Sequence, residues 1–315
     1  MSFVRALTAE NVILTEGAII ERLRRNHKVN LNPNILHAGF LFEKQSRCIL
    51  EACYREYVEI AHSYHLPIII GTPTWRANPE RLQADGRYQL HAVHDAAAAF
   101  LRAVRDDYPD HSNNVYIAGM LGCRGDAYDP RDALEIDEAK DFHGIQVHAL
   151  AASGVDFLLA ATLPASSEAL GIAHAMDEFD LPYILSFVIH PSGTLPDGTL
   201  LHDIINDIDA QTEKKPLCYW VNCVHPSNFE KAMRHINEHS PAAARRIMGL
   251  QANTSTLTPE ELDNSPALHE ESPDVFGELM WRIHKNLGIK ILGGCCGTDP
   301  SHISSLAQLV RRHKA

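Results

Sequence analysis

The sequence predicts a single (β/α)8 barrel over residues 1–315, and three observations support this fold class. Eight short, apolar and mostly β-branched segments recur along the chain, with longer segments of helical periodicity between them. The apolar character of the short segments is nearly continuous, as expected of strands buried on both faces of a parallel sheet. Eight parallel strands close a barrel, and 315 residues suffice for one. An open doubly wound sheet is the alternative, but no Gly-x-Gly-x-x-Gly follows the first strand, where the chain has Glu16-Gly17-Ala18.

The expected strands and helices alternate along the chain. We expect strands at residues 11–14, 66–71, 115–120, 155–160, 182–188, 217–223, 246–251 and 289–294. We expect helices at residues 43–63, 90–108, 133–152, 166–178, 227–238, 273–287 and 300–312. Pro300 follows Asp299, which is typical of a helix start with an N-cap before proline. Residues 254–273, rich in Thr, Pro, Asp and Glu, are expected to form a long loop on the barrel rim.

Composition and charge limit the classes of function. Hydrophobic residues make up 45% of the chain and charged residues 22%, which is typical of a globular protein with a large core. A net charge of −12 argues against nucleic acid or an anionic membrane as the partner, because both require a basic face. No segment approaches the roughly 20 apolar residues that span a bilayer. The first residues do not form a signal peptide, so we expect a cytoplasmic protein, as a monomer or an oligomer.

The seven cysteines do not indicate a secreted disulfide framework, because their number is odd and the chain is long. We expect Cys48, Cys53, Cys123 and Cys218 to pack in the core. The 19 histidines form no metal-binding pattern such as His-Glu-x-x-His. Two of them, at positions 91 and 94, are expected on the solvated face of a helix.

The string Gly293-Gly294-Cys295-Cys296-Gly297 is the most informative part of the sequence. Two adjacent cysteines in a regular strand would point to opposite faces and could not bind one ion. The flanking glycines allow the backbone to leave β geometry there, so that both sulfurs can converge. Cys223 ends the sixth expected strand, and the carboxyl ends of strands six and eight face the same mouth of a barrel.

Three thiolates around zinc leave one tetrahedral position open, which is typical of a catalytic site. A thiol substrate bound there would be deprotonated, and three anionic sulfur ligands would keep it nucleophilic. Activation of water for hydrolysis would instead favour histidine and carboxylate ligands. The sequence therefore predicts a zinc site at Cys223, Cys295 and Cys296 that activates a thiol. The alternative is that these cysteines simply pack at strand ends in a metal-free barrel.

The chain resembles the homocysteine S-methyltransferases, which include betaine- and S-methylmethionine-dependent enzymes. The resemblance rests on GGCCGTDPSHI at residues 293–303 and VNC at 221–223, supported by IAGMLGCRGDAY at 117–128, GVD at 154–156 and TPTWRAN at 72–78. It extends from about residue 11 to the end of the chain. It implies a (β/α)8 barrel whose three zinc cysteines are Cys223, Cys295 and Cys296.

Two positions depart from the family pattern. Members of the family usually have Asp-Gly-Gly or Asp-Gly-Ala after the first strand, where this chain has Glu16-Gly17-Ala18. They usually carry a glutamate near the fourth strand that meets the amino group of homocysteine, where this chain has Ala161. The cysteine motifs therefore match the family pattern, whereas the position that would meet the amino group of the thiol does not.

Several polar or aromatic residues lie where the expected strands end and are candidates for substrate contacts. Glu16 could pair with a substrate amine, and Trp75 could face a cationic methyl donor. Each also has a purely structural explanation, as a helix N-terminal acid and a packed rim aromatic. The full set of candidates is Glu16, Gly17, Thr72, Thr74, Trp75, Thr162, Asn222 and Asn253.

The function predicted from the sequence is transfer of a methyl group from a small sulfonium or quaternary ammonium donor to a zinc-bound thiol. The acceptor is expected to be homocysteine, giving methionine, and the partners are therefore two small molecules. No catalytic residue is expected beyond the metal site, because positioning and thiolate formation carry the reaction. The alternatives are a different thiol acceptor, a separate corrinoid protein as donor, and a zinc-binding barrel without activity, which Ala161 favours.

Overall fold

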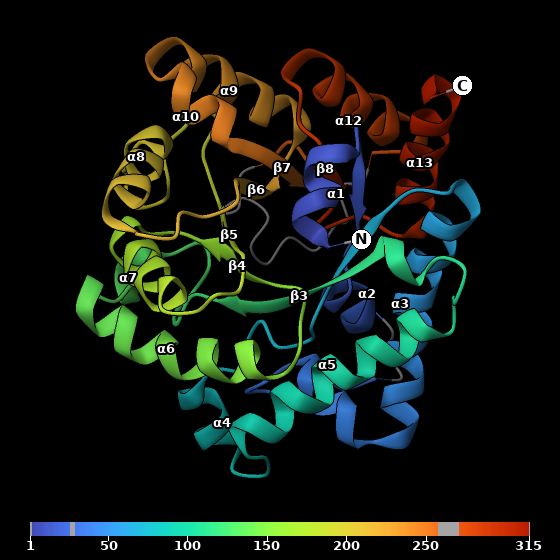
Figure 1. Ribbon diagram of the computed structural model, residues 1–315, viewed down its shortest axis with the longest axis vertical. Helices are drawn as coiled ribbons and strands as arrows, with labels where there is room; N and C mark the ends of the chain where they lie inside the picture. The colour runs from blue at the N-terminus through green and yellow to red at the C-terminus, as the bar shows by residue number, and fades with distance from the viewer. Residues whose placement is uncertain (1, 26–28, 258–270, 315) are drawn as a thin grey trace.

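The computed structural model, which describes residues 2–25, 29–257 and 271–314, confirms the predicted barrel. Eight parallel strands form one closed sheet in chain order, with β1 hydrogen-bonded to both β2 and β8 (Figure 1). This closure excludes the open doubly wound alternative. The strands are β1 (Ile13–Thr15), β2 (Ile68–Gly71), β3 (Val115–Gly122), β4 (Phe157–Leu163), β5 (Tyr183–Phe187), β6 (Tyr219–Val224), β7 (Ile247–Ala252) and β8 (Ile291–Gly294).

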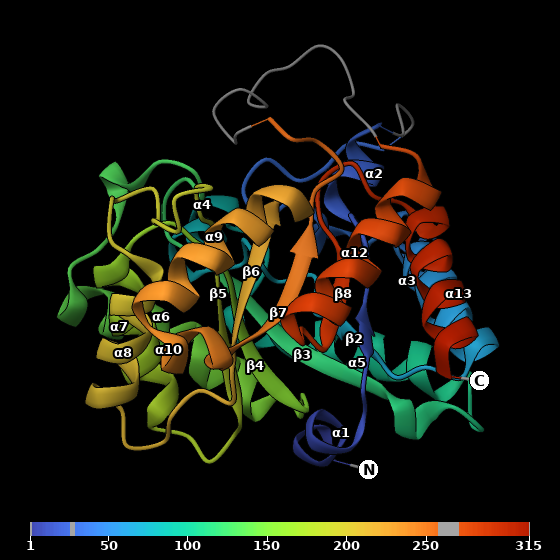
Figure 2. The ribbon, with the colours of Figure 1, turned by 90° about the horizontal axis from the view of Figure 1, so that it is seen from above.

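Helices surround the sheet on its outer face (Figures 1 and 2). All the predicted helices are present, with ends within three residues of those expected: α3 (Lys44–Tyr64), α5 (Leu90–Asp106), α6 (Ile136–Ala152), α7 (Ser166–Asp177), α9 (Pro226–His239), α12 (Pro273–Leu287) and α13 (Pro300–Lys314). The sequence did not predict α1 (Phe3–Ala9), α2 (Ile20–Arg25), α4 (Pro79–Asp85), α8 (Leu201–Gln211) and α10 (Pro241–Arg246). Short 3-10 turns, η1 (His37–Phe42), η2 (Ser112–Asn114) and η3 (Pro130–Asp132), lie in the connections between these elements.

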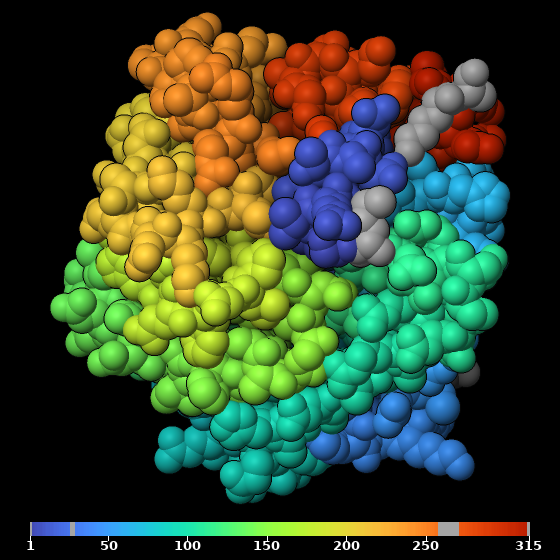
Figure 3. All heavy atoms as spheres, viewed as in Figure 1, coloured from blue at the N-terminus to red at the C-terminus, as the bar shows by residue number. Residues whose placement is uncertain are grey.

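Alternate strand residues divide the core into two parts. Those that face the barrel axis, such as Ile69, Phe157 and Trp220, form one buried apolar cluster, and those that face outward pack against the helices. Helix α1 closes the end of the barrel where the strands begin, and Figure 3 shows it across the middle of that face. The Phe3 ring stacks on Phe157 with 4.1 Å between ring centroids, which anchors α1 to the interior cluster. Only the carboxyl ends of the strands therefore remain for a site inside the barrel.

Two expectations about single residues are wrong. His94 is fully buried instead of solvated, because it lies on the same face of α5 as Ala97, Ala98 and Leu101. Its Nδ1 lies 2.8 Å from the Leu90 carbonyl oxygen, and burial lowers its pKa to about 4. Cys48 is exposed instead of packed in the core.

The expected rim loop at 254–273 falls largely outside the described residues, which cover only 254–257 and 271–273 of it. Within the described part of the chain, no helix combines the length and the apolar character needed to cross a bilayer.

Candidate metal centre

The structure brings the sulfur atoms of Cys223, Cys295 and Cys296 together, with all three Sγ atoms within 4.8 Å of one another. Cys223 belongs to the end of β6, and the paired cysteines directly follow β8. Since β7 separates these two strands in the closed sheet, their carboxyl ends meet at one edge of the mouth. Among the described residues, no other group of three or more His, Cys, Asp or Glu ligand atoms is as compact.

The backbone leaves regular β geometry at each cysteine position. Cys223 has a positive φ of 58°, and the register between β6 and β7 shifts there, so the strand carries a bulge. After β8, Thr298 N–H donates to the Cys295 carbonyl at 3.1 Å and closes a turn. Gly297 has a φ of 83° in this turn, and a Cβ there would lie 1.8 Å from Thr254 Oγ1. Glycine is therefore required at this position, as the sequence indicated for the flanks of the cysteine pair.

Three sulfurs at this distance cannot all be thiolates without a cation. Hydrogen bonds from the Cys295 and Cys296 thiols hold the pKa of Cys223 well below its usual range. The same hydrogen bonds to Cys223, together with burial, raise the pKa of Cys295, and the pKa of Cys296 rises to about 12. A divalent ion would replace these protons, and three soft sulfur donors fit zinc.

Asn222 orients Cys223 by joining three strands through its amide. Its Oδ1 accepts hydrogen bonds from Ser186 Oγ at 2.6 Å and from Thr162 N–H at 3.1 Å. Its Nδ2 donates to Thr162 Oγ1 at 2.8 Å and to Cys223 Sγ at 3.2 Å. Thr162 lies at a bulge of β4 with a positive φ of 65°. The structure thus gives Asn222 and Thr162 a role in positioning the sulfur, and their polar side-chain atoms are engaged with the protein.

Tyr128 is a site residue to which sequence reasoning gave no role. Its hydroxyl donates to Cys223, and burial together with the nearby sulfurs raises the pKa of Tyr128 well above its usual value. Tyr128 follows the end of β3 by six residues. The only sequence signal was its place at the end of the string 117–128 that resembles the family. A tyrosine that far beyond a strand end does not by itself predict a contact with the metal centre.

Glu16 lies directly after β1 and is 6% exposed. Its Oε1 accepts a hydrogen bond from Gly71 N–H at 2.9 Å, while its Oε2 is buried and has no partner among the described residues. Burial raises the pKa of Glu16 to about 7. The neighbouring Gly17 is fixed by packing, because a Cβ there would lie 2.8 Å from both Tyr57 Oη and Thr298 Oγ1. Glu16 therefore remains available to a polar ligand, whereas Gly17 serves close packing.

The three candidates for substrate contacts that follow β2 mainly form hydrogen bonds to the ends of neighbouring strands. Thr72 and Thr74 are fully buried and share a hydrogen bond of 2.7 Å between their hydroxyls. Thr72 Oγ1 accepts a hydrogen bond from Met120 N–H at 2.8 Å, and Thr74 Oγ1 donates one to the Met120 carbonyl at 2.6 Å. Trp75 Nε1 donates to the Ala161 carbonyl at 3.1 Å, and the guanidinium carbon of Arg76 lies 4.1 Å from the centroid of the Trp75 ring. One face of this indole is thus occupied by a cation of the chain itself.

Asn253 follows β7 and is 3% exposed. Its backbone N–H donates to the Val224 carbonyl at 3.0 Å, which continues the pairing of β7 with β6. Its side-chain Oδ1 is buried and lacks a hydrogen-bond partner among the described residues. Asn253 and Glu16 are therefore the two candidates whose side chains retain a free polar atom.

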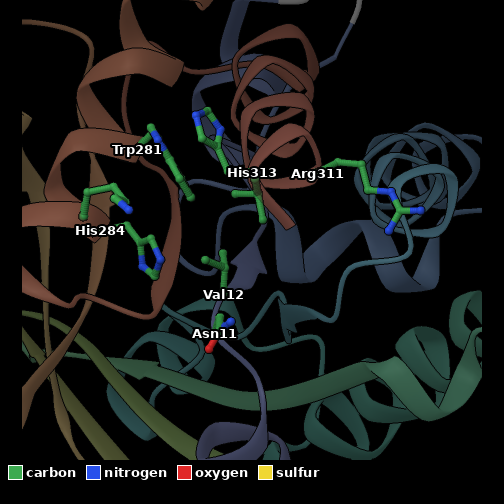
Figure 4. A pocket seen from close by; sticks show the side chains of 8 residues that line it. Asn11, Val12, Trp281, His284, Arg311 and His313 are labelled. Atoms are coloured by element: carbon green, nitrogen blue, oxygen red, sulfur yellow. The ribbon is translucent and has the colours of Figure 1, made fainter. Parts of the chain in front are cut away.

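A cavity of about 620 Å³ lies elsewhere, between α12, α13 and the residues that precede β1 (Figure 4). Trp281, His284 and His313 line it together with Asn11 and Val12. Since Asn11 and Val12 lie at the amino end of β1, this cavity is at the opposite end of the barrel from the cysteines. It is separate from the candidate metal centre.

Comparisons with known proteins assign the chain to a family. The model of the family described as homocysteine S-methyltransferase matches residues 13–310. Homocysteine S-methyltransferase YbgG of Bacillus subtilis is 23% identical, with 96% of each chain covered. Selenocysteine Se-methyltransferase of Brassica oleracea is 25% identical over 93% of this chain and 87% of its own length.

A solved structure supports the fold. The homocysteine methyltransferase MmuM of Escherichia coli, in a form described as metallated, superimposes with a TM-score of 0.76 at 20% identity, covering 97% of this chain and 98% of its own. The match of the family model over nearly the whole chain is the decisive observation, and the predicted resemblance is confirmed. The chain belongs to the homocysteine S-methyltransferase family and is a methyltransferase.

Proposed function

We propose that the chain binds zinc through Cys223, Cys295 and Cys296 and transfers a methyl group from a small sulfonium or quaternary ammonium donor to homocysteine. The observation that carries this proposal is the convergence of three sulfurs at the carboxyl mouth of the barrel. When bound there, zinc would hold the acceptor sulfur as a thiolate at neutral pH, in the position that three protein ligands leave open.

The residues of the chain prepare this chemistry by holding the ligands in place. Asn222 directs Cys223 toward the other two sulfurs, and Tyr128 donates a hydrogen bond to the same sulfur. Neutral donors of this kind compensate part of the negative charge on a thiolate ligand. Helix α1 and the interior apolar cluster close the barrel below the site, which excludes water from that side.

The zinc assignment predicts the effect of removing single cysteines. Purified protein should contain about one zinc ion with three sulfur ligands at about 2.3 Å, as measured by elemental analysis and X-ray absorption. Alanine at position 223, 295 or 296 should remove most of this metal, since each change deletes a ligand. The exposed Cys48→Ala variant is the control and should keep it. Zinc retained at the wild-type level in all three ligand variants would refute the assignment.

The acceptor proposal depends on how the amino group of homocysteine is held. Ala161 offers no side-chain acceptor, and its carbonyl is already bonded to Trp75. Glu16 has a free carboxylate oxygen, but it follows β1, whereas Ala161 lies in β4, three strands away around the barrel. A fully charged partner for an ammonium would contribute about 1.5–3 kcal/mol, or about 10- to 150-fold in affinity. We therefore expect weak recognition of the amine.

The test compares kcat/KM for homocysteine and 4-mercaptobutyrate with one methyl donor, corrected for the pKa of each thiol. At pH 7 the preference for homocysteine should be below about tenfold, and the ionisation of Glu16 above pH 7 should increase it by no more than about twofold. A screen of sulfonium, quaternary ammonium and methyl-corrinoid donors with homocysteine identifies the donor class. A preference well above tenfold that survives Glu16→Ala would contradict this account of the acceptor site.

A further inference from the structure

Three histidines from two neighbouring helices gather on the outside of the barrel. His202 lies in the first turn of α8, and His235 and His239 lie in the last two turns of α9. The ring centroids are 4.2 Å apart for His235 and His239, 5.9 Å for His202 and His239, and 6.4 Å for His202 and His235. Figures 1 and 2 both show α8 beside α9. In the sequence only His235 and His239 are close together, four residues apart. The fold brings His202 next to them.

The spacing of the rings is that of ligands around one metal ion. Zinc binds imidazole nitrogen at about 2.0–2.1 Å, so the centroids of two rings on a tetrahedral ion lie about 5 Å apart. The three observed separations, from 4.2 to 6.4 Å, bracket this value. His235 and His239 are one helical turn apart, which is the spacing that lets two histidines on a helix share an ion.

One of the three imidazoles already has a hydrogen-bond partner for one ring nitrogen, and a second has a carboxylate nearby. His239 Nδ1 lies 2.8 Å from the His235 carbonyl oxygen, which favours a proton on Nδ1 and leaves the lone pair on Nε2. His202 Nε2 lies 3.6 Å from Asp203 Oδ1. Histidines that bind metals commonly direct their second nitrogen to a carbonyl or carboxylate in this way.

His202 supplies an independent sign of a missing ligand. Its side chain is only 9% exposed, and its Nδ1 is buried without a hydrogen-bond partner among the described residues. A buried polar nitrogen without a partner is costly, because it has lost its contact with water. A bound cation at this nitrogen would remove that cost.

The imidazole rings must rotate slightly before their nitrogen atoms can bind one ion. Among the described residues, only the cysteines form a group of three ligand atoms all within 4.8 Å of one another, so the imidazole nitrogens do not yet converge. His239 is exposed and His235 is partly exposed, so both rings can rotate about their side-chain bonds without disturbing the core. The buried His202 would remain as the fixed ligand.

We propose that His202, His235 and His239 form a second metal site, which binds a divalent ion suited to imidazole ligands, such as zinc or nickel. Helix α9 starts just after Cys223 and has 14 residues, a length of about 20 Å, so its far end is well separated from the cysteines. The ion would join α8 to α9 and stabilise their packing. This site goes beyond the proposed methyl transfer and does not depend on it.

The experiment measures zinc per chain after equilibrium dialysis at micromolar free zinc. The wild-type protein should bind about two ions, one for each site. The His235→Gln/His239→Gln variant should bind about one, and both changes are at the surface, so the fold should be retained. The His91→Gln/His313→Gln variant, also altered at exposed helical positions, is the matched control and should bind about two.

A Cys295→Ser/Cys296→Ser variant separates this inference from the proposed function. In that variant, zinc or nickel bound at the histidines should still raise the melting temperature. Adding His235→Gln and His239→Gln to it should abolish this increase. Equal zinc binding by the wild-type and His235→Gln/His239→Gln proteins would overturn the second site and leave the cysteine site untouched. Zinc that is lost with the histidine pair but not with the cysteine pair would support the second site and refute the cysteine site.

Discussion

Replacement of Glu16 by glutamine tests whether the mouth of the barrel holds a carboxyl group with a raised pKa. Glu16 is 6% exposed, and only one of its carboxylate oxygens has a hydrogen-bond partner among the described residues. Burial raises its pKa from 4.5 to about 7. Glutamine has nearly the same shape and can keep the bond from Gly71, but it carries no charge at any pH.

The sign of the effect follows from proton binding. Because the pKa is higher in the folded chain, the folded state binds the proton more tightly than the unfolded state does. The resulting stabilisation is fully present below pH 4.5 and is lost as the pH rises through about 7. At 1.36 kcal/mol per pH unit, the wild-type protein should lose about 2.5 kcal/mol relative to Glu16→Gln between pH 5 and pH 8.

The assay is urea unfolding at several pH values between 5 and 8, with both proteins at the same measured zinc content. The free energy of unfolding of Glu16→Gln minus that of the wild type should increase steadily across this range. Glu138→Gln, on the exposed side of α6, is the control and should give a much smaller change. A difference between Glu16→Gln and the wild type that does not vary with pH would refute the reasoning, because it would mean that the carboxyl group is ionised as in water.

Two further predictions concern the metal centre and the barrel interior. Tyr128→Phe removes a hydrogen bond to the Cys223 sulfur and should weaken zinc binding by about 10-fold or more. The zinc affinity is measured by competition with a chelator, and an unchanged affinity would exclude a role for the hydroxyl. Gly249→Ala would place a Cβ 2.4 Å from the buried indole of Trp220 and should lower the free energy of unfolding by about 1–3 kcal/mol. Gly144→Ala, a helical position whose Cβ would meet nothing closer than 4.0 Å, should instead be neutral or stabilising, and equal effects of the two glycine changes would contradict the packing argument.

The strands and the position of the cysteines were predictable for a physical reason. Strands buried on both faces need continuous apolar side chains, and this pattern marked all eight of them. The parallel order then places all carboxyl ends at one mouth, so that Cys223 and the pair after β8 had to be near each other. The short helices α1, α2, α4 and α10 have six or seven residues each, which is too short for a clear helical periodicity.

Contacts that depend on the path of a loop were not predictable. Tyr128 reaches Cys223 from a segment that leaves β3 six residues earlier, and no periodic pattern fixes where such a segment goes. The burial of His94 depends on which face of α5 meets the sheet, and a polar residue on that face gives the opposite signal. Likewise, His202 joins His235 and His239 only because α8 and α9 are neighbours in the folded chain.

The backbone at Cys223 shows most clearly why one sequence does not reveal the geometry of a site. Cys223 and Thr162 both have positive φ angles without being glycine, and each such conformation costs about 1–2 kcal/mol. Asn222 makes four hydrogen bonds around them, to Ser186, Thr162 twice and Cys223, which uses its two donors and two acceptors. At about 0.5–1.5 kcal/mol each, these bonds are sufficient to offset the strain. The direction of the Cys223 sulfur is therefore set by three strands acting through one amide, and an asparagine beside a cysteine in a linear sequence cannot indicate partners that lie on two other strands.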